Sequence, residues 1–499
     1  MVVDILEAVP AAGKTAAILK HVMDTDKKVV IASISRQLSR QSFEYYQSIG
    51  GTDGIIVDSD NKNEYMSVAK TLVAVMKTEP RVVFVTHSAL MQYAELERFR
   101  GYNLYIDEVP DMISLQILRF TANSGHILKY CHTVGESVGV YYPLSLNEEF
   151  EDELRGIAED GLYRNDDIAE RLLPAYRCLL RGHPVVLKRE SDEASSMFFI
   201  EDYTNMHWDV FDSITIACAN FSPTLTGYVL KNWVGWQFRD SPLKKNLAIL
   251  KYPNTSRVTI SVMVDQNWSR YVSEKTIGGE NVYSIIQDKI DTMFPSGEYI
   301  YTTNSYRSRM NGQQIQYNPH GLNMYSDETN VVALFSYNPQ PWQIPILSSL
   351  ANLQGVDENG LVDAFLVSKY LEPVFQLCTR GDIRNIDSMK PIKLVVPDMR
   401  AAEYLKSNYL PDACIDRSGI IEVCSDVKAP KDYNWAKRGI TAVVGMTEPE
   451  RKAFYYLLKK TGKKSGDYDP TNPKDLMYVQ NWLTEHREKK SKKKKKSGA

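Results

Sequence analysis

Short apolar runs alternate with longer amphipathic segments over the first hundred residues. Runs rich in Val, Ile, Leu and Tyr predict strands at 2–6, 28–32, 54–57, 81–85 and 103–106. Between them, apolar positions at helical spacing predict helices at 37–48 and 64–77. Strands that alternate with helices are typical of βαβ units, so this part of the chain is predicted to form an α/β domain around a parallel sheet.

The alternation is interrupted between about residue 111 and residue 207. Two stretches rich in Glu, Asp, Leu and Arg, at 147–159 and 166–181, favour helices there. The strand pattern resumes at 212–218. We therefore expect a largely helical insertion at about 111–207, within a first domain that spans residues 1–230.

A second alternating series follows this domain. Further strands are predicted at 258–264, 298–302, 331–335 and 392–396. They indicate a second α/β domain at 231–411, followed by a small accessory region at 412–485. A helix is predicted at 447–459 in that region, because Thr447 suits the N-cap and Glu450 the third helical position of a capping box.

Charge is distributed unevenly along the chain. The 499 residues are 43% hydrophobic and 24% charged, which excludes fibrous and wholly disordered proteins, and the net charge is −3. From His486 onward the chain holds eight Lys or Arg and one Glu, so an acidic body ends in a basic tail. Because a run of like charges repels itself, residues 486–499 are predicted to be a disordered basic tail.

The chain shows no sign of membrane insertion or export. No apolar run approaches the roughly 18 residues that a membrane-spanning helix needs, and the first ten residues lack the basic start of a signal peptide. The six cysteines are scattered without a CxxC pair, which argues against a disulfide framework or a zinc ribbon. We expect no membrane partner and a cytoplasmic protein, in the host cytoplasm if the chain is viral.

The clearest chemical motif follows the first predicted strand. The sequence there reads Ala8-Val9-Pro10-Ala11-Ala12-Gly13-Lys14-Thr15. This is the phosphate-binding pattern G-x-x-x-x-G-K-[ST] with Ala in place of the first Gly, and such a loop turns its N–H groups toward phosphate at a helix N-terminus. Lys14 is expected to reach the β- and γ-phosphates of ATP and Thr15 to bind Mg²⁺. The residues predicted to bind the nucleotide are Ala8, Pro10, Ala11, Ala12, Gly13, Lys14 and Thr15.

An acidic pair ends the apolar strand predicted at 103–106. Asp107 can hold the metal through water, and Glu108 can orient or deprotonate the water that attacks the γ-phosphate. Thr15 and Asp107 are therefore predicted metal ligands, and Lys14 and Glu108 are predicted catalytic residues of an ATP hydrolase.

With this loop and this acidic pair, the chain resembles the superfamily 2 helicases, the DExx-box nucleic-acid-dependent ATPases. The resemblance covers roughly residues 1–400 and implies two tandem RecA-like P-loop domains that bind MgATP in the cleft between them. Pro110 at the fourth position of the box distinguishes the chain from the DEAD and DEAH members. The style of the motifs is similar to that of divergent bacteriophage helicases.

Further segments resemble nucleic-acid-binding motifs of this family. Thr86 and His87 follow a predicted strand, as the Thr-bearing backbone contact of the family does. Thr303 and Asn304 lie in a segment that resembles the strand and loop gripping one nucleic-acid strand. Gly321 lies where the family has a Gly-containing loop that contacts both the backbone and the nucleotide, and a Gly permits that close approach.

The last motif lies at 376–384 and resembles the family pattern Q-x-x-G-R-x-x-R. The resemblance implies that Gln376 contacts the nucleotide and that Arg380 or Arg384 reaches the γ-phosphate from the second domain. Thr379 replaces the Gly of the pattern, and one extra residue precedes Arg384. A spacing of four places the two arginines on one face of a helix, and of the two Arg380 is the favoured arginine finger.

Together these motifs predict an ATP-dependent helicase or translocase that acts on nucleic acid, DNA rather than RNA, with replication or recombination proteins as expected partners. Lys492, Lys493 and Lys494 of the tail are predicted to contact the phosphate backbone. Two alternatives stay open. One is a viral DNA-packaging ATPase, which should add a metal nuclease domain, and the other is a nucleic-acid-binding interaction protein whose ATPase has decayed.

Overall fold

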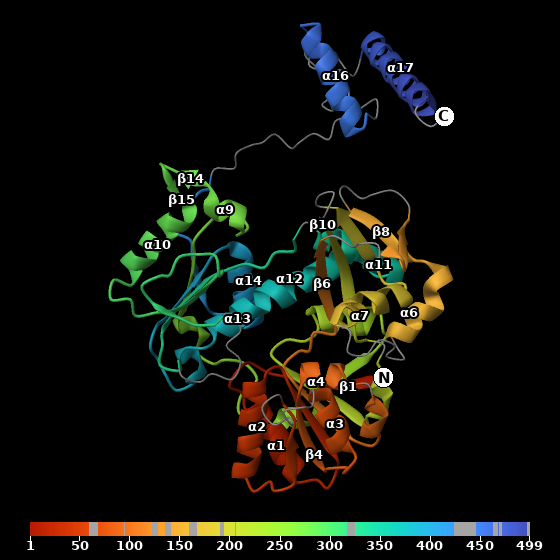
Figure 1. Ribbon diagram of the computed structural model, residues 1–499. Coiled ribbons are helices and arrows are strands. Elements are labelled where there is room, and N and C mark those ends of the chain that lie inside the picture. The colour runs from red at the N-terminus through yellow and green to blue at the C-terminus, as the bar shows by residue number, and fades with distance from the viewer. Residues whose placement is uncertain are drawn as a thin grey trace. The chain divides into compact units, whose positions relative to one another are not determined.

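The computed structural model describes most of the chain in two compact units, Met1–Val423 and Cys424–Ala499. The described residues are 1–58, 68–93, 95–121, 128–134, 141–158, 167–189, 194–204, 206–316, 325–340, 342–423, 446–462, 468 and 472–496. The large unit contains two parallel sheets and a five-stranded antiparallel sheet, each covered by helices (Figure 1). This confirms the predicted α/β class with two tandem parallel-sheet domains. None of the described helices is both long and apolar enough to cross a lipid bilayer.

Seven parallel strands form the first sheet, in the order β12-β1-β11-β5-β2-β4-β3. The strands are β1 (Val2–Glu7), β2 (Val29–Ser33), β3 (Gly54–Ile56), β4 (Val82–Thr86), β5 (Asn103–Asp107), β11 (Ser213–Cys218) and β12 (Gln237–Asp240). The carboxyl ends of parallel strands share one edge of a sheet, and β11 alone separates β1 from β5. The loop after β1 and the acidic pair after β5 therefore open on the same edge.

Helices cover both faces of the first sheet. They are α1 (Lys14–Met23), α2 (Arg36–Ser48), α3 (Val68–Met76), α4 (His87–Met91) and α8 (Leu225–Asn232). Leu19 of α1 and Tyr46 of α2 are buried on one face, and Leu72 of α3 and Leu90 of α4 are buried on the other. Burial on both faces explains why the central strands read as continuous apolar runs.

The segment between β5 and β11 is not the largely helical insertion predicted at 111–207. Its centre is a five-stranded antiparallel sheet in the order β6-β10-β9-β8-β7. The strands are β6 (Ile113–Thr121), β7 (Cys131–Thr133), β8 (Tyr141–Leu146), β9 (Val185–Arg189) and β10 (Ala194–Asp202). In the described part of the stretches that favoured helix, α6 (Glu151–Ala158) and α7 (Asp167–Leu180) form.

The two faces of this inserted sheet have different partners. Met197 and Phe199 face the cluster formed with α6 and α7, whereas Phe198 and Ile200 face α8, α11 (Gln343–Gln354) and α12 (Glu358–Leu366). Apolar residues on both faces remove the alternation by which an antiparallel strand is recognised in a sequence. The insertion therefore contacts helices on both sides of the boundary between the two domains.

Six parallel strands form the second sheet, in the order β17-β16-β18-β19-β13-β20. The strands are β13 (Val258–Val262), β16 (Ile300–Thr303), β17 (Gln313–Gln314), β18 (Asn330–Leu334), β19 (Ile392–Val396) and β20 (Cys414–Asp416), with a separate hairpin of β14 (Thr276–Ile277) and β15 (Glu280–Asn281). Val374 of α13 (Glu372–Cys378) and Leu405 of α14 (Met399–Asn408) are buried on one face. The other face is covered by α9 (Arg270–Glu274) and α10 (Val282–Met293).

The domain boundaries predicted at 230 and 411 fall short of the sheets. β12 extends the first sheet to Asp240, and β20 adds an edge strand to the second sheet beyond residue 411. Both strands are short edge strands with several polar residues, so neither produces an apolar run in the sequence. Residues 412–423 thus belong to the second domain, and the accessory region begins later.

The small unit contains α16 (Glu448–Lys460) and α17 (Pro473–Lys496). The helix predicted at 447–459 is confirmed, and the Thr447 N–H donates to Glu450 Oε2 at 2.8 Å, as a capping box requires. The predicted disordered tail is wrong as far as Lys496, because α17 continues through the lysine run. Lysine is a good helix former, and positive charge is favourable at a helix C-terminus.

Replacing Arg257 by Ala is expected to lower the free energy of unfolding by about 3 kcal/mol, because it leaves the carboxylate of Asp382 buried without its ion-pair partner. Arg257 Nη1 lies 2.5 Å from Asp382 Oδ2, and the two side chains are 7% and 1% exposed. Urea unfolding measures the change. The variant Arg270→Ala, which removes an ion pair at the surface, is the control and should change stability by less than about 1 kcal/mol. Equal losses in the two variants would contradict the expectation.

Candidate functional site

The loop between β1 and α1 has the conformation that the phosphate-binding motif predicts. Gly13 has a φ of 84°, a left-handed value that favours glycine, and it is the N-cap of α1. The first N–H groups of a helix have no acceptor within the helix, so those at the start of α1 are available to an anion. Ala8 is not among the described residues with positive φ, so the first position of the loop does not need a glycine.

Lys14 crosses the inside of this loop. Its Nζ donates to the carbonyl oxygens of Ala8 at 2.8 Å and Val9 at 3.2 Å, and the residue is 8% exposed. The ammonium group is therefore held over the loop by neutral acceptors and not by a carboxylate. A phosphate group in the loop offers it a stronger, charged acceptor.

The linker between the two domains forms hydrogen bonds to the phosphate-binding loop. Tyr252 is buried, and its Oη donates to the Pro10 carbonyl at 3.1 Å, while the Ala248 N–H donates to the Ala12 carbonyl at 3.1 Å. Tyr252 also belongs to the buried cluster of the second domain. The loop is thus tied to both domains, a contact that no local sequence motif predicts.

Thr15 and Asp107 bring two side-chain oxygens together at the loop. The Thr15 hydroxyl donates to Asp107 Oδ2 at 2.8 Å, although 92 residues separate them in the chain. Burial and then repulsion from Glu108 raise the pKa of Asp107 to about 6, against the Thr15 hydrogen bond and the charge of Lys14. A hydroxyl and a carboxylate fit the preference of Mg²⁺ for one or two protein oxygens beside phosphates and water. A bound cation would favour the ionised form of Asp107.

Glu108 adopts a left-handed backbone conformation directly after β5. Its φ is 73°, and its N–H donates to the Ala217 carbonyl of β11 at 2.8 Å. Ala11 in the loop has a φ of 66°, so two of the four described non-glycine residues with positive φ lie at this site. Such a conformation costs roughly 1–2 kcal/mol and is concentrated at functional sites.

The second domain contributes Gln376, Arg380 and Arg384 to the same cavity. The prediction that the two arginines share one face of a helix is wrong. α13 ends at Cys378, and Arg384 lies in a separate short helical turn. Both arginines nevertheless reach the cavity, since the chain turns tightly at Gly381, where a Cβ would lie 2.1 Å from the Glu328 carbonyl oxygen.

The two arginines differ in their surroundings. Burial and then repulsion from Arg384 lower the pKa of Arg380 to about 10, and burial also lowers the pKa of Arg384. Arg380 is 4% exposed. Arg384 Nε donates to the Thr379 carbonyl at 2.6 Å. The Arg384 side chain is thus held by the backbone at the end of α13.

The cavity has a volume of about 320 Å³ and walls from both domains. The first domain supplies the loop, Asp107 and Glu108, and it also supplies a side of α2 that we did not predict from the sequence. The α2 residues are Leu38, Gln41, Ser42 and Tyr45. Counted from Leu38, the other three residues lie three, four and seven positions later, so all four share one face of the helix predicted at 37–48. This helical spacing is the sequence pattern from which that wall of the cavity could have been predicted.

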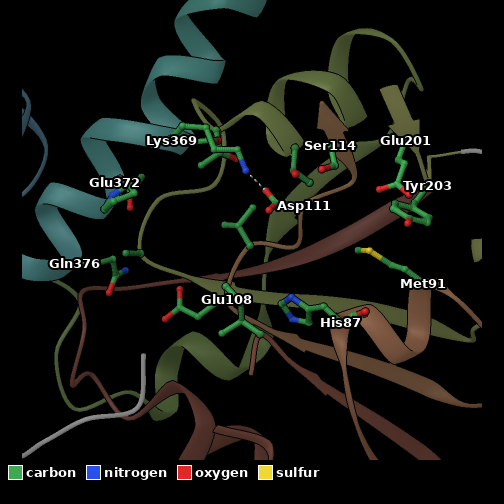
Figure 2. Close-up of a pocket in the computed structure, with 18 of the residues that line it drawn as sticks. His87, Met91, Glu108, Asp111, Ser114, Glu201, Tyr203, Lys369, Glu372 and Gln376 are labelled. Atoms are coloured by element: carbon green, nitrogen blue, oxygen red, sulfur yellow. Dashed lines mark hydrogen bonds and ion pairs between the residues drawn. The ribbon is translucent and has the colours of Figure 1, made fainter. Parts of the chain in front are cut away.

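A second cavity of about 460 Å³ adjoins the first, with Glu108 and Gln376 lining both. Figure 2 shows Glu372 and Gln376 on one side and Glu108 and His87 on the other. The Lys369 ammonium lies 2.9 Å from Asp111 Oδ1 and so joins the two domains across this cavity. Burial raises the pKa of Glu372 to about 7, although two tyrosine hydroxyls donate to it.

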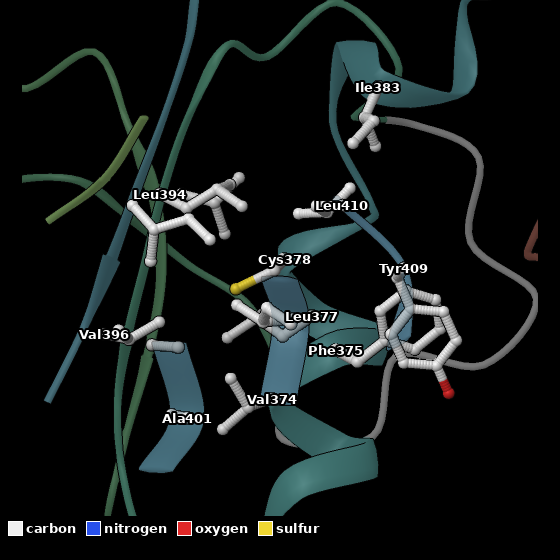
Figure 3. Close-up of a cluster of buried hydrophobic side chains, with 14 of the residues drawn as sticks. Val374, Phe375, Leu377, Cys378, Ile383, Leu394, Val396, Ala401, Tyr409 and Leu410 are labelled. Atoms are coloured by element: carbon white, nitrogen blue, oxygen red, sulfur yellow. The ribbon is translucent and has the colours of Figure 1, made fainter. Parts of the chain in front are cut away.

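The helix that carries Gln376 is anchored in the core of the second domain. Val374, Phe375 and Leu377 of α13 pack among buried residues of β19 and α14 (Figure 3). The rings of Phe375 and Tyr409 are stacked, with centroids 3.4 Å apart. This packing fixes the end of α13, from which Arg380 follows two residues later.

The predicted nucleic-acid contacts of the first domain have other roles in this conformation. Thr86 accepts a hydrogen bond from the Ala89 N–H at 3.2 Å and so caps α4. His87 is 7% exposed and lines the second cavity, and its Nε2 has no hydrogen-bond partner among the described residues. Burial lowers the pKa of His87 to about 4, so it is neutral near pH 7 and adds no positive charge for a phosphate.

Neither Thr303 nor Asn304, the predicted nucleic-acid contacts of the second domain, lines either cavity. Thr303 and Asn304 are each 7% exposed, and they bond to the Leu334 carbonyl at 3.2 Å and the Ser336 carbonyl at 3.3 Å. In this conformation both side chains form hydrogen bonds within the domain, and their contact with nucleic acid stays a prediction. Gly321 lies outside the described residues. The structure places Lys492, Lys493 and Lys494 in the last turns of α17.

Comparisons with known proteins assign no family to the chain. No protein-family model matches the chain, and no curated protein matches its sequence significantly. The solved structure of S. tokodaii Xpd4 is similar at a TM-score of 0.48 and 10% identity, over 83% of this chain and 96% of that chain. S. cerevisiae Dbp5 bound to RNA and ADP BeF3 is similar at a TM-score of 0.31 and 10% identity, over 85% of each chain. At these scores the likeness assigns no function to this chain.

Proposed function

We propose that this protein is a nucleic-acid-dependent ATPase that works as a helicase or translocase. One observation carries the proposal: a single cavity brings together the phosphate-binding loop and acidic pair of the first domain with two arginines of the second. The residues that meet there are Lys14, Thr15, Asp107, Glu108, Arg380 and Arg384. Phosphoryl transfer to water requires positive charge around the phosphoryl group and a residue that orients the attacking water. The lysine and arginines of this cavity can supply the first and a carboxylate the second.

In the proposed reaction a water molecule attacks the γ-phosphorus of ATP. Glu108 accepts the proton of the water as the new O–P bond forms, and the bond from the γ-phosphorus to the β–γ bridging oxygen breaks to release ADP. Lys14 of the first domain and Arg380 of the second stabilise the negative charge on the phosphoryl oxygens. Mg²⁺, when bound through Thr15 and Asp107, supplies further positive charge at the phosphates.

The position of the cavity links this chemistry to movement. Its walls belong to two domains, so a nucleotide held by Lys14 on one wall and by Arg380 on the other favours a closed arrangement of the domains. Release of the products removes that preference. We propose that this cycle moves the protein along a nucleic acid, that the track is DNA, and that replication or recombination proteins are its partners.

Replacing Lys14 by Ala is expected to lower the nucleic-acid-stimulated rate of ATP hydrolysis by about 10²- to 10³-fold, because one preorganised charge at the phosphates is lost. The rate is measured with and without single-stranded DNA, double-stranded DNA and RNA. Lys20→Ala is the matched control, because Lys20 lies in the same helix at an exposed position. Hydrolysis that is indifferent both to nucleic acid and to Lys14 would refute the ATPase motor.

The same measurements separate the alternatives. An interaction protein with a decayed ATPase would bind nucleic acid but release no phosphate, with or without Lys14. Displacement of a strand from a forked duplex distinguishes a helicase from a translocase that only moves along one strand or a duplex. The RNA arm of the assay tests whether DNA is the track.

A further inference from the structure

The two units of the chain carry opposite net charges. Residues 424–499 contain 19 Lys or Arg and 9 Asp or Glu, whereas residues 1–423 contain 40 Lys or Arg and 53 Asp or Glu. The small unit therefore has a net charge of +10 and the large unit a net charge of −13. Residues 486–499 account for +7 of this +10, so the remaining residues of the small unit also carry a net positive charge. A polyanion is attracted to the small unit and repelled by much of the large one.

Packing between α16 and α17 determines which face of α16 is turned outward. Phe454 and Leu458 are buried in the cluster between the helices, and the ring centroids of Phe454 and Trp482 are 4.8 Å apart. Arg487 Nε of α17 donates to Glu450 Oε1 at 2.8 Å and ties α17 to the start of α16. The opposite face of α16 is consequently exposed.

That exposed face combines aromatic and basic side chains. Lys452, Lys459 and Lys460 lie three or four residues from Tyr456, about one helical turn away, so they share its face. All three lysines are exposed, Tyr456 is 74% exposed, and Tyr455 beside it is 46% exposed. Large aromatic side chains with so much exposed surface bury little apolar area within the fold, which favours a role in contact with a ligand.

These side chains have the chemistry of a single-strand binding surface. Unstacked bases of any sequence can stack on a tyrosine ring, and lysines beside the ring neutralise the phosphates. Residues 451–460 contain no Asp or Glu, so no carboxylate of this segment repels a phosphate. We propose that the outer face of α16 binds single-stranded nucleic acid. The residues of this α16 face are Lys452, Tyr455, Tyr456, Lys459 and Lys460.

The inference takes only the class of ligand from the proposed function. It adds a contact that lies in the small unit, outside the two-domain ATPase, and binding by stacking and charge needs no nucleotide. It can therefore be tested in the full-length protein without ATP, which keeps its outcome separate from that of the hydrolysis assays.

Replacing Tyr456 by Ala is expected to weaken binding of a fluorescein-labelled oligothymidylate by about tenfold, as measured by fluorescence anisotropy, because one base loses its stacking partner. An oligonucleotide of abasic sugars has no bases to stack, so its affinity should be the same for the wild type and the variant. The melting temperature should not change, because Tyr456 is 74% exposed. Tyr271→Ala is the matched control, since Tyr271 is 59% exposed in the large unit.

The three lysines are tested through the salt dependence of binding. For a single strand, each lost phosphate contact reduces the slope of log affinity against log salt concentration by about 0.7, so the triple variant Lys452→Gln, Lys459→Gln, Lys460→Gln should reduce it by about 2. An unchanged slope together with an unchanged affinity for Tyr456→Ala overturns the inference. A higher affinity of the triple variant than of the wild type also overturns the inference, because the three lysines would then hinder binding instead of contributing to it.

The two proposals fail separately. If Lys14→Ala abolishes hydrolysis while the α16 variants bind as the wild type does, only the α16 face is rejected. If no hydrolysis occurs but Tyr456→Ala weakens binding to the oligothymidylate and not to the abasic strand, only the ATPase is rejected. A matching RNA oligonucleotide shows whether the α16 face distinguishes the two nucleic acids.

Discussion

Replacing Arg380 by Ala is expected to slow nucleic-acid-stimulated ATP hydrolysis by about 10³- to 10⁵-fold, the range found for arginine fingers. Arg380 is 4% exposed and lines the cavity that the phosphate-binding loop also lines. Its lowered pKa of about 10 still leaves it charged near pH 7, and charge in a buried site interacts strongly with a phosphoryl group. The measurement is the turnover number at saturating ATP and nucleic acid.

Three comparisons separate catalysis by Arg380 from a structural role. Arg384→Ala should have a smaller effect, because the Arg384 side chain is held by the Thr379 carbonyl. Arg380→Lys should recover only part of the rate, since lysine lacks the planar fork that binds two phosphoryl oxygens. Arg270→Ala, with its side chain 70% exposed, should be unchanged. If Arg380→Ala turns over ATP within about tenfold of the wild type, the arginine-finger role is wrong.

The first-domain half of the candidate site was predictable because its chemistry is local in the sequence. The loop from Ala8 to Thr15 is bounded by an apolar strand and a helix, and Asp107 ends another apolar strand. Parallel strands bring their carboxyl ends to one edge, so the Thr15 to Asp107 contact over 92 residues follows from the strand pattern. The same pattern predicted most strands of both parallel sheets.

The insertion was not predictable in the same way, because its strands are covered on both faces. Phe198 and Phe199 are adjacent and both buried, so the period of two that marks an antiparallel strand is absent. Trp342 follows a Pro-rich segment that suggests an exposed loop, yet its ring lies 4.8 Å from that of Phe198. Such pairings depend on which helices of the second domain meet the inserted sheet, and no local pattern encodes that.

The second-domain half of the site was only partly predictable. Arg380 and Arg384 reach the cavity, but through a turn at Gly381 and not along one helix, because α13 ends at Cys378. Thr303 and Asn304 match a motif in spacing, yet both side chains are needed for hydrogen bonds inside the domain. Motif spacing locates a segment, whereas the direction of each side chain depends on the local turn and its packing.

Replacing Glu108 by Gln is expected to slow ATP hydrolysis by about 10²- to 10⁴-fold while the nucleotide still binds, because an amide cannot accept the proton of the attacking water. Glu108 lies between the two cavities, on a backbone held in the left-handed region by the hydrogen bond from its N–H to Ala217. That conformation is independent of the side chain, so Gln should occupy the same position. The amide is similar in size to the carboxylate and removes only its charge and basicity.

Two measurements distinguish this loss of chemistry from a loss of binding. A fluorescent ATP analogue should bind the Glu108→Gln variant with an affinity close to that of the wild type, because Lys14 and the loop are intact. Asp111→Asn is the matched control: Asp111 lies three residues further along and also lines the second cavity, with its side chain 66% exposed. Its turnover should fall much less than that of Glu108→Gln, because Asp111 does not line the first cavity and contributes only a partly exposed ion pair. Equal rate losses in both variants would mean that the carboxylates act through the charge of the second cavity, and Glu108 would then not be the base.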